Sequence, residues 1–144
     1  MLFSEARHRK IVSTTTADTV GRVDELLVDP QRHAILAINV GKADRGDTLR
    51  WQDLTAFGVD AVTVSDAEQI SEADDEVKAL SGKNHRIMGK RVLTTHGDEL
   101  GSVADVEFEP SSGVITAIQL DGQQVEGVRL VGIGSYAVVV HPTD

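Results

Sequence analysis

The stretch from Lys90 to Leu120, KRVLTTHGDELGSVADVEFEPSSGVITAIQL, is a second copy of Lys10 to Val40. A shift of 80 residues aligns the two segments without a gap and gives 11 identities in 31 positions. The identical residues of the first copy are Lys10, Val12, Thr14, Thr15, Asp18, Gly21, Val23, Pro30, Ile35, Ala37 and Ile38. An internal repeat of this kind decides the architecture before any other feature. The chain is therefore expected to consist of two copies of one small unit.

Composition indicates a folded protein with small aliphatic cores. Hydrophobic residues make up 40% of the 144 residues and charged residues 26%, which is typical of a globular chain. Aromatic residues make up only 3%, so Val, Ile, Leu and Ala must build the cores. A unit of about 60–65 residues buries a smaller fraction of its surface than a larger domain does, and we therefore expect the two copies to pack against each other.

Charge and the absent cysteines narrow the functional classes. The net charge of −9 disfavours nucleic acid and anionic membrane surfaces as partners, because both attract basic proteins. The absence of cysteine excludes disulfides, thiol catalysis and thiolate metal sites. No apolar run approaches the roughly 20 residues that cross a bilayer, and the first residues lack the order of a signal peptide. The expected location is the cytoplasm.

The second strand of each copy carries apolar residues at irregular spacing. Val23, Leu26 and Val28 are separated by three and then two residues, and Val103, Val106 and Phe108 repeat this pattern. Side chains alternate along a strand, so one extra residue is needed to keep all three on one face. The spacing predicts a β-bulge near residues 24–25 and 104–105.

A proline turn follows each second strand. The sequences are Asp29 to His33 in the first copy and Glu109 to Gly113 in the second. Proline favours a type I turn, and a four-residue hairpin loop on this turn commonly closes with a residue at positive φ. Gly113 adopts such a conformation freely, and His33 is expected to adopt it in the first copy.

The remaining segments complete an all-β fold. Third strands are expected at 34–40 and 114–120, a polar loop at 42–47, and closing segments at 54–64 and 130–140. We predict two small antiparallel β-barrels in tandem, with boundaries at 1–66 and 85–144. Between them, residues 67–84 form a linker with a short helix at about 72–81, capped by Ser71 at its start and Gly82 at its end.

The order of motifs in residues 89–120 resembles the PRC-barrel family. It reads Gly-Lys-Arg-Val, a polar turn, Leu-Gly-x-Val, Asp-Val, an acidic-Pro turn with glycine, and Ile-x-Ala-Ile. Residues 9–40 match the same order more loosely. The family includes the cytoplasmic part of the H subunit of bacterial photosynthetic reaction centres and the C-terminal domain of the ribosome maturation factor RimM. The resemblance implies a small barrel that docks on other proteins.

No motif for catalysis or metal binding is present. Histidines at positions 8, 33, 85, 96 and 141 lack any metal-ligand spacing. Ser135 follows glycines in GIGSY, but no helical pattern follows it to form a nucleophile elbow. We therefore assign no catalytic, cofactor-binding or metal-binding residue and expect a protein that is not an enzyme.

Differences between the copies indicate candidate contact surfaces. At four aligned sites one copy is apolar and the other polar: Leu27 against Glu107, Leu36 against Thr116, Leu93 against Ser13, and Val139 against Thr63. Leu27 and Leu36 are expected opposite each other on an outer face, where the linker helix, the other barrel or an external partner would cover them. Trp51, whose counterpart is Gly127, is a further interface candidate, because tryptophan is enriched at binding hot spots and in cores.

These features favour a non-catalytic adaptor or scaffold that binds an unidentified protein partner or a second copy of itself. A RimM-like role in ribosome assembly, through docking on a ribosomal protein, is one alternative. A small-molecule sensor or enzyme with a site between the barrels is another.

Overall fold

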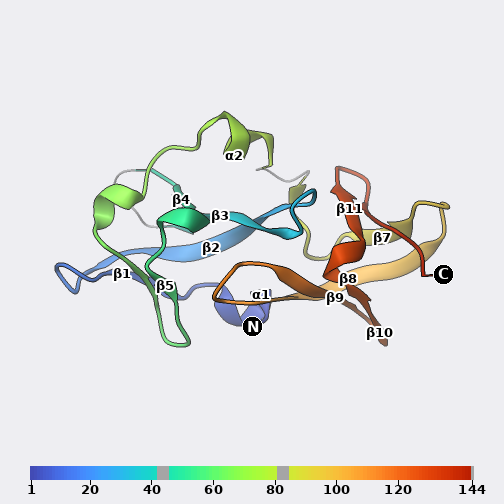
Figure 1. Ribbon diagram of the computed structural model, residues 1–144, viewed down its shortest axis with the longest axis horizontal. Coiled ribbons are helices and arrows are strands. Elements are labelled where there is room, and N and C mark those ends of the chain that lie inside the picture. The colour runs from blue at the N-terminus through green and yellow to red at the C-terminus, as the bar shows by residue number, and fades with distance from the viewer. Residues whose placement is uncertain (42–45, 81–84, 144) are drawn as a thin grey trace.

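A computed structural model describes residues 1–41, 46–80 and 85–143 as two six-stranded sheets that lie side by side (Figure 1). The first sheet has the order β4-β3-β2-β1-β6-β5 and the second the order β10-β9-β8-β7-β12-β11. The strands of the first sheet are β1 Lys10–Ser13, β2 Thr19–Asp29, β3 Ala34–Gly41, β4 Thr48–Arg50, β5 Ala56–Phe57 and β6 Val62–Val64. Those of the second are β7 Arg91–Thr94, β8 Glu99–Phe108, β9 Ile115–Leu120, β10 Gln123–Glu126, β11 Leu130–Ile133 and β12 Val138–Val140. The predicted all-β tandem fold is confirmed.

Strand pairing departs from the purely antiparallel barrels that the sequence predicts. The first strand of each repeat pairs in parallel with the last, β1 with β6 and β7 with β12, and all other pairs are antiparallel. Each sheet curls until its two edge strands are joined by a short 3₁₀ helix, η1 Trp51–Asp53 in the first and η4 Gly127–Arg129 in the second. Each barrel is thus closed by this covalent connection rather than by a further ladder of hydrogen bonds.

The local backbone features expected of each hairpin are present. The β2–β3 register shifts between Val23 and Glu25, and the β8–β9 register shifts between Val103 and Asp105, so both bulges are confirmed. His33 has φ 55° and closes the first proline turn as predicted. The bulges increase local twist and keep the apolar side chains of β2 and β8 directed inward.

The two repeats are offset by 81 residues in their first strand, not by 80. Ile11 pairs with Gly21, and Val92 pairs with Gly101, so Ile11 corresponds to Val92. Just before these strands, His8 and Gly89 both have positive φ, 69° and 78°.

The extra residue lies in the turn after the first strand. In the first repeat Ser13 N–H donates to Asp18 O, whereas in the second Thr94 N–H donates to Asp98 O, one residue closer. The gap-free alignment is therefore wrong before this turn. Leu93 corresponds to Val12 and not to Ser13, so one of the four apolar–polar differences disappears.

One core runs through both barrels. Phe3, Trp51, Phe57 and Phe108 form an aromatic cluster at the junction, with ring centroids 5.4–6.1 Å apart. The starts of β3 and β9 also meet there, because Ile35 N–H donates to the carbonyl of the second proline turn and Ile115 N–H donates to that of the first, both at 2.8 Å. The expectation that the halves pack against each other is confirmed.

The segment that leads into each barrel lies on the other barrel. Helix α1, Phe3–Ala6, packs on β8, and Met1 exchanges backbone hydrogen bonds of 2.8 and 2.9 Å with Phe108 (Figure 1). In the opposite direction, Arg86 pairs with Glu25 of β2 at 3.3 Å. The two units thus contact each other through the segment that precedes each of them. The predicted domain boundaries at residues 66 and 85 stay predictions.

The linker helix is shorter than predicted. Helix α2 spans Asp75–Ala79, and Asp74 caps it by accepting a 2.9 Å hydrogen bond from Val77 N–H. Ser71 does not cap the helix, since its backbone forms a bridge with Thr48 at the start of β4. The predicted cap at Gly82 lies outside the described residues. The linker also contains the 3₁₀ helix η2, Ala67–Gln69.

Candidate functional site

The outer face of β2 and β3 carries a small apolar cluster beneath α2. Leu27 and Leu36 are 9% and 7% exposed, and they pack with Ala37 and Val77 in a cluster separate from the main core. Leu80 and Ala73 of the linker are partly buried against it. Of the three covers considered from sequence, the linker helix is the one that the structure places over these leucines. The sequence left this cover open between the linker helix, the other barrel and an external partner, and the assignment of Leu27 and Leu36 to an interface with a partner stays a prediction.

The predicted pairing of these two leucines is wrong. A second bulge between Leu27 and Val28 places Leu27 opposite Ala37 and leaves Leu36 in the irregular position. In the second repeat the corresponding Glu107 is half-buried and Thr116 is exposed, and Thr116 Oγ1 donates a 2.9 Å hydrogen bond to Glu107 Oε2. The difference in polarity between the repeats therefore follows the presence of α2 over the first barrel.

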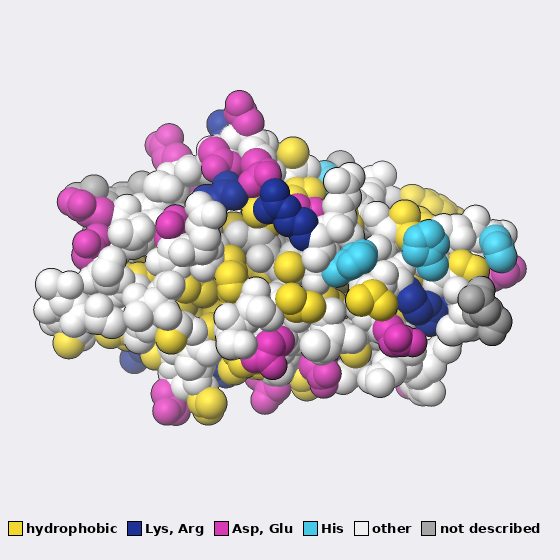
Figure 2. Space-filling view, viewed as in Figure 1, with side chains coloured by type: hydrophobic (Ala, Val, Ile, Leu, Met, Phe, Trp, Pro, Cys, Tyr) yellow, Lys and Arg dark blue, Asp and Glu magenta, His cyan; other side chains and the backbone are white. Residues whose placement is uncertain are grey.

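Two arginines hold the acidic side of α2. Arg50 donates from its two terminal nitrogens to Asp74 and to Glu76, each at 2.6 Å. Arg32, in the β2–β3 turn, lies 3.7 Å from Glu76 and 3.5 Å from Asp29. Figure 2 shows Lys or Arg side chains beside Asp or Glu side chains on the upper part of this face, where Figure 1 places α2. The sequence predictions included neither arginine.

Electrostatics strengthens this contact. The hydrogen bond with Glu76 raises the pKa of Arg50, and the bond and charge of Asp74 add to this effect. The N–H of Val77 lowers the pKa of Asp74, and Arg50 lowers it further. Both ions of the Arg50–Asp74 pair are thus charged over the physiological range.

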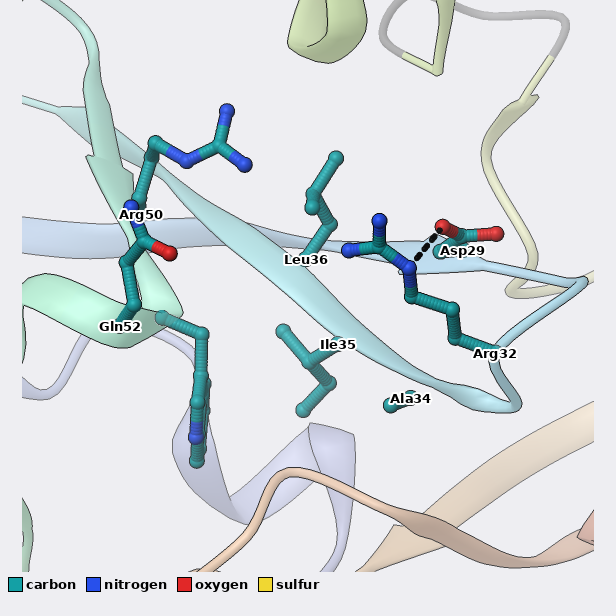
Figure 3. A pocket seen from close by; sticks show the side chains of 8 residues that line it. Asp29, Arg32, Ala34, Ile35, Leu36, Arg50 and Gln52 are labelled. Atoms are coloured by element: carbon teal, nitrogen blue, oxygen red, sulfur yellow. Dashed lines mark ion pairs between the residues drawn. The ribbon is translucent and has the colours of Figure 1, made fainter.

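A cavity of about 220 Å³ adjoins the α2 contact. Figure 3 shows Arg50 and Arg32 extending toward each other across Leu36, with Ile35 and Ala34 along the floor. The Nε of Arg50 is buried and has no hydrogen-bond partner among the described residues. Helix α2 therefore leaves part of this surface and one buried donor unused.

Trp51 lies half-buried at the junction of the barrels and lines the same cavity. Its ring stacks on Phe57 at 5.5 Å and covers Gly113, where an added Cβ would lie 2.8 Å from the ring. Its counterpart, Gly127, has no room for a side chain, because a Cβ there would lie 1.9 Å from Ile115 O. The role of Trp51 in the structure is to pack the two barrels together. Its assignment as an interface residue for a partner stays a prediction.

The second barrel has an open apolar groove of about 440 Å³. Leu93 and Val139 are neighbours on paired strands and form its floor, and Tyr136, which is 66% exposed, stands at its edge. Arg91 lies 4.6 Å above the Tyr136 ring and donates a 2.9 Å hydrogen bond to its hydroxyl. This hydrogen bond and ring contact hold Tyr136 in place without covering it.

The first barrel has polar residues at two of these places. With the offset of 76 that relates the closing strands, Asp60 replaces Tyr136 and Thr63 replaces Val139. The sequence comparison identified the Val139 difference, but it did not single out Tyr136. An exposed aromatic residue beside an apolar floor is the signal that could have found it.

The remaining candidate residues are structural or isolated. His33 Nε2 donates to Leu130 O at 2.9 Å and links the barrels. Arg9 and Lys90, which directly precede β1 and β7, donate to the carbonyls of Gly58 and Gly134 at 2.8 and 2.7 Å. Ser135 lies in the turn between β11 and β12 and not at a strand-to-helix turn. Within residues 1–41, 46–80 and 85–143, no three His, Asp or Glu side chains are grouped as metal ligands would be.

The comparison with protein families matches residues 83–141 to the PRC-barrel domain. The second barrel is a PRC-barrel domain. The first sheet repeats the strand order of the second, so the chain is a tandem of two barrel-like units. No curated protein matches the chain at a significant level. In the described part of the chain, no helix has the length and apolarity needed to cross a membrane.

Proposed function

We propose that this tandem PRC-barrel chain is a non-catalytic adaptor that binds a protein partner through the groove of its second barrel. The observation that supports this function is the exposed apolar groove formed by Leu93, Val139 and Tyr136. Large aromatic side chains with an apolar surround are typical of the residues that dominate binding energy at protein interfaces. The corresponding face of the first barrel is interrupted by Asp60 and Thr63, so the groove is specific to one repeat.

The shape of the groove favours a protein segment over a small substrate. The groove is open, its lining is apolar except for Ser135 and Tyr136, and the Tyr136 hydroxyl already accepts a hydrogen bond from Arg91. Enzyme and sensor sites are usually concave and contain convergent polar groups that are free to bind a ligand. The junction between the barrels, where the sequence placed a site for the enzyme alternative, is filled by the aromatic cluster.

Site-specific photocrosslinking tests this function. A benzophenone amino acid replaces Tyr136 in one version of the chain and Asp60, the equivalent exposed position of the first barrel, in the other. We expect a discrete adduct with one protein from the Tyr136 position only, and loss of most of that adduct when Val139→Thr is added. Equal adducts from both positions, or a yield unaffected by Val139→Thr, would refute the proposal.

The identity of the crosslinked protein then separates the alternatives. A ribosomal protein would support the role in ribosome assembly, and a second copy of the chain would make the groove a homodimer interface. With the purified partner, Val139→Thr is expected to weaken binding by about 10-fold, since an apolar side chain at an interface contributes on the order of 1–2 kcal/mol.

A further inference from the structure

We propose that the face of β2 and β3 beneath α2 is a receptor for a short acidic amphipathic segment of a partner protein, and that α2 is its resident occupant. This surface differs from the groove of the second barrel, so the proposal does not rest on the function argued above. The surface fits a segment that has two carboxylates two residues apart and apolar residues one and four positions after the second carboxylate. Helix α2 has this pattern in Asp74, Glu76, Val77 and Leu80.

The chemistry of the surface defines the occupant. Leu27 and Leu36 receive apolar side chains, and Arg50 and Arg32 at the edge receive carboxylates. Arg50 is suited to this task because its planar guanidinium presents several donors in fixed directions. The protein has a net charge of −9, so most of its surface favours basic or neutral segments. This face has a cationic rim beside an apolar floor and therefore favours an acidic segment.

Helix α2 is held weakly enough to be exchanged. Its buried contact is the small cluster around Val77, which does not join the main core, and it has only five helical residues. Short helices have little stability of their own, so contacts with β2 and β3 must hold α2 in place. Local elements with few buried apolar contacts open at much lower free energy than the global fold.

The same surface offers more than α2 uses. The 220 Å³ cavity continues from Leu36 past Arg50, and the buried Nε of Arg50 has no partner in the described part of the chain. A partner segment with a further acceptor at this point would satisfy a donor that is otherwise costly to bury. A partner can therefore compete with a helix that has the advantage of being attached to the same chain.

The test measures binding of the α2 sequence in trans. The probe is an acetylated and amidated peptide of residues 71–80, SEADDEVKAL, titrated into ¹⁵N-labelled full-length chain carrying Val77→Asp, which removes the resident helix from the surface. We expect saturable shifts of the Leu27, Leu36 and Arg50 amides with a dissociation constant on the order of 1 mM. Wild-type chain should bind at least about 10-fold more weakly, because its own helix occupies the surface.

Charge reversal provides the matched control. A peptide with Lys at the positions of Asp74 and Glu76 should lose at least about 10-fold in affinity, and a receptor that also carries Arg50→Glu should regain it. If the Val77→Asp chain unfolds, a full-length chain with Glu76→Gln and Leu80→Asp takes its place as the receptor. The absence of shifts at these amides up to about 5 mM peptide, or equal shifts from both peptides, would overturn the proposal. Crosslinking at Tyr136 is unaffected by either result.

Discussion

Two glycines with nearly the same backbone conformation allow the contact between the barrels to be measured. Gly89 has φ 78° and Gly113 has φ 79°. A Cβ at Gly89 would meet nothing within 4 Å, whereas a Cβ at Gly113 would lie 2.8–3.1 Å from three ring atoms of Trp51. Replacement by alanine therefore imposes the same backbone strain at both sites, but a steric clash at only one.

The expected losses differ by the cost of that clash. Alanine at positive φ costs about 1 kcal/mol of unfolding free energy, which is the whole effect expected for Gly89→Ala. Gly113→Ala should lose a further 1–3 kcal/mol or so, because the Trp51 ring is packed against Phe57 and cannot move away freely. For a chain of this length, each kcal/mol lowers the melting temperature by about 2–4 °C.

Thermal and urea unfolding, followed by circular dichroism, measure both variants. In a Trp51→Ala background the ring is absent, so Gly113→Ala should then cost no more than Gly89→Ala. Such a double-mutant cycle isolates the coupling between Gly113 and the ring. Equal losses for Gly89→Ala and Gly113→Ala in the wild-type background would show that Trp51 does not restrict the second proline turn, and this account of the junction would be refuted.

Two further predictions concern the contact of α2 with the first barrel. Leu36→Thr introduces the residue of the second repeat and should lower the hydrogen-exchange protection factor of the Val77 amide about 10-fold. The melting temperature should fall by only a few degrees, because this cluster is separate from the main core. A loss of protection throughout the chain would contradict this prediction. Asp74 has a pKa below its ordinary value of 3.8, so its contribution is fully present above that pH and is lost as pH falls through the lowered pKa. Val77 protection should therefore be constant from about pH 8 to about pH 5 and decline below about pH 4, and Asp74→Asn should remove much of this decline; an unchanged profile in Asp74→Asn would contradict the assignment to Asp74.

Backbone rules local to a few residues made the repeat predictable from sequence. The spacing of Val23, Leu26 and Val28 is sufficient to require a bulge, and the proline turn is sufficient to require positive φ at His33. The offset of the first strands was not predictable in the same way. His8 stands where the second repeat has Gly89, and a histidine does not signal positive φ as a glycine does.

Contacts between distant segments were beyond the sequence. The parallel pairing of β1 with β6 joins short strands that are about 50 residues apart, and nothing local distinguishes parallel from antiparallel pairing. The leucines beneath α2 were recognisable as an outer apolar face because the second repeat is polar there. Their cover depends on Arg50 meeting Asp74 across 24 residues, which neither segment indicates alone.

The exchange of leading segments has a consequence for how the chain can be divided. Met1 and α1 complete the edge of β8, and Arg86 lies on β2, so each half holds a piece of the other. Two polypeptides cut within the linker should therefore reassemble by fragment complementation, whereas either polypeptide alone leaves an aromatic core open to water. The linker would then serve mainly to set the local concentration of one half near the other, as a tether does in a split reporter.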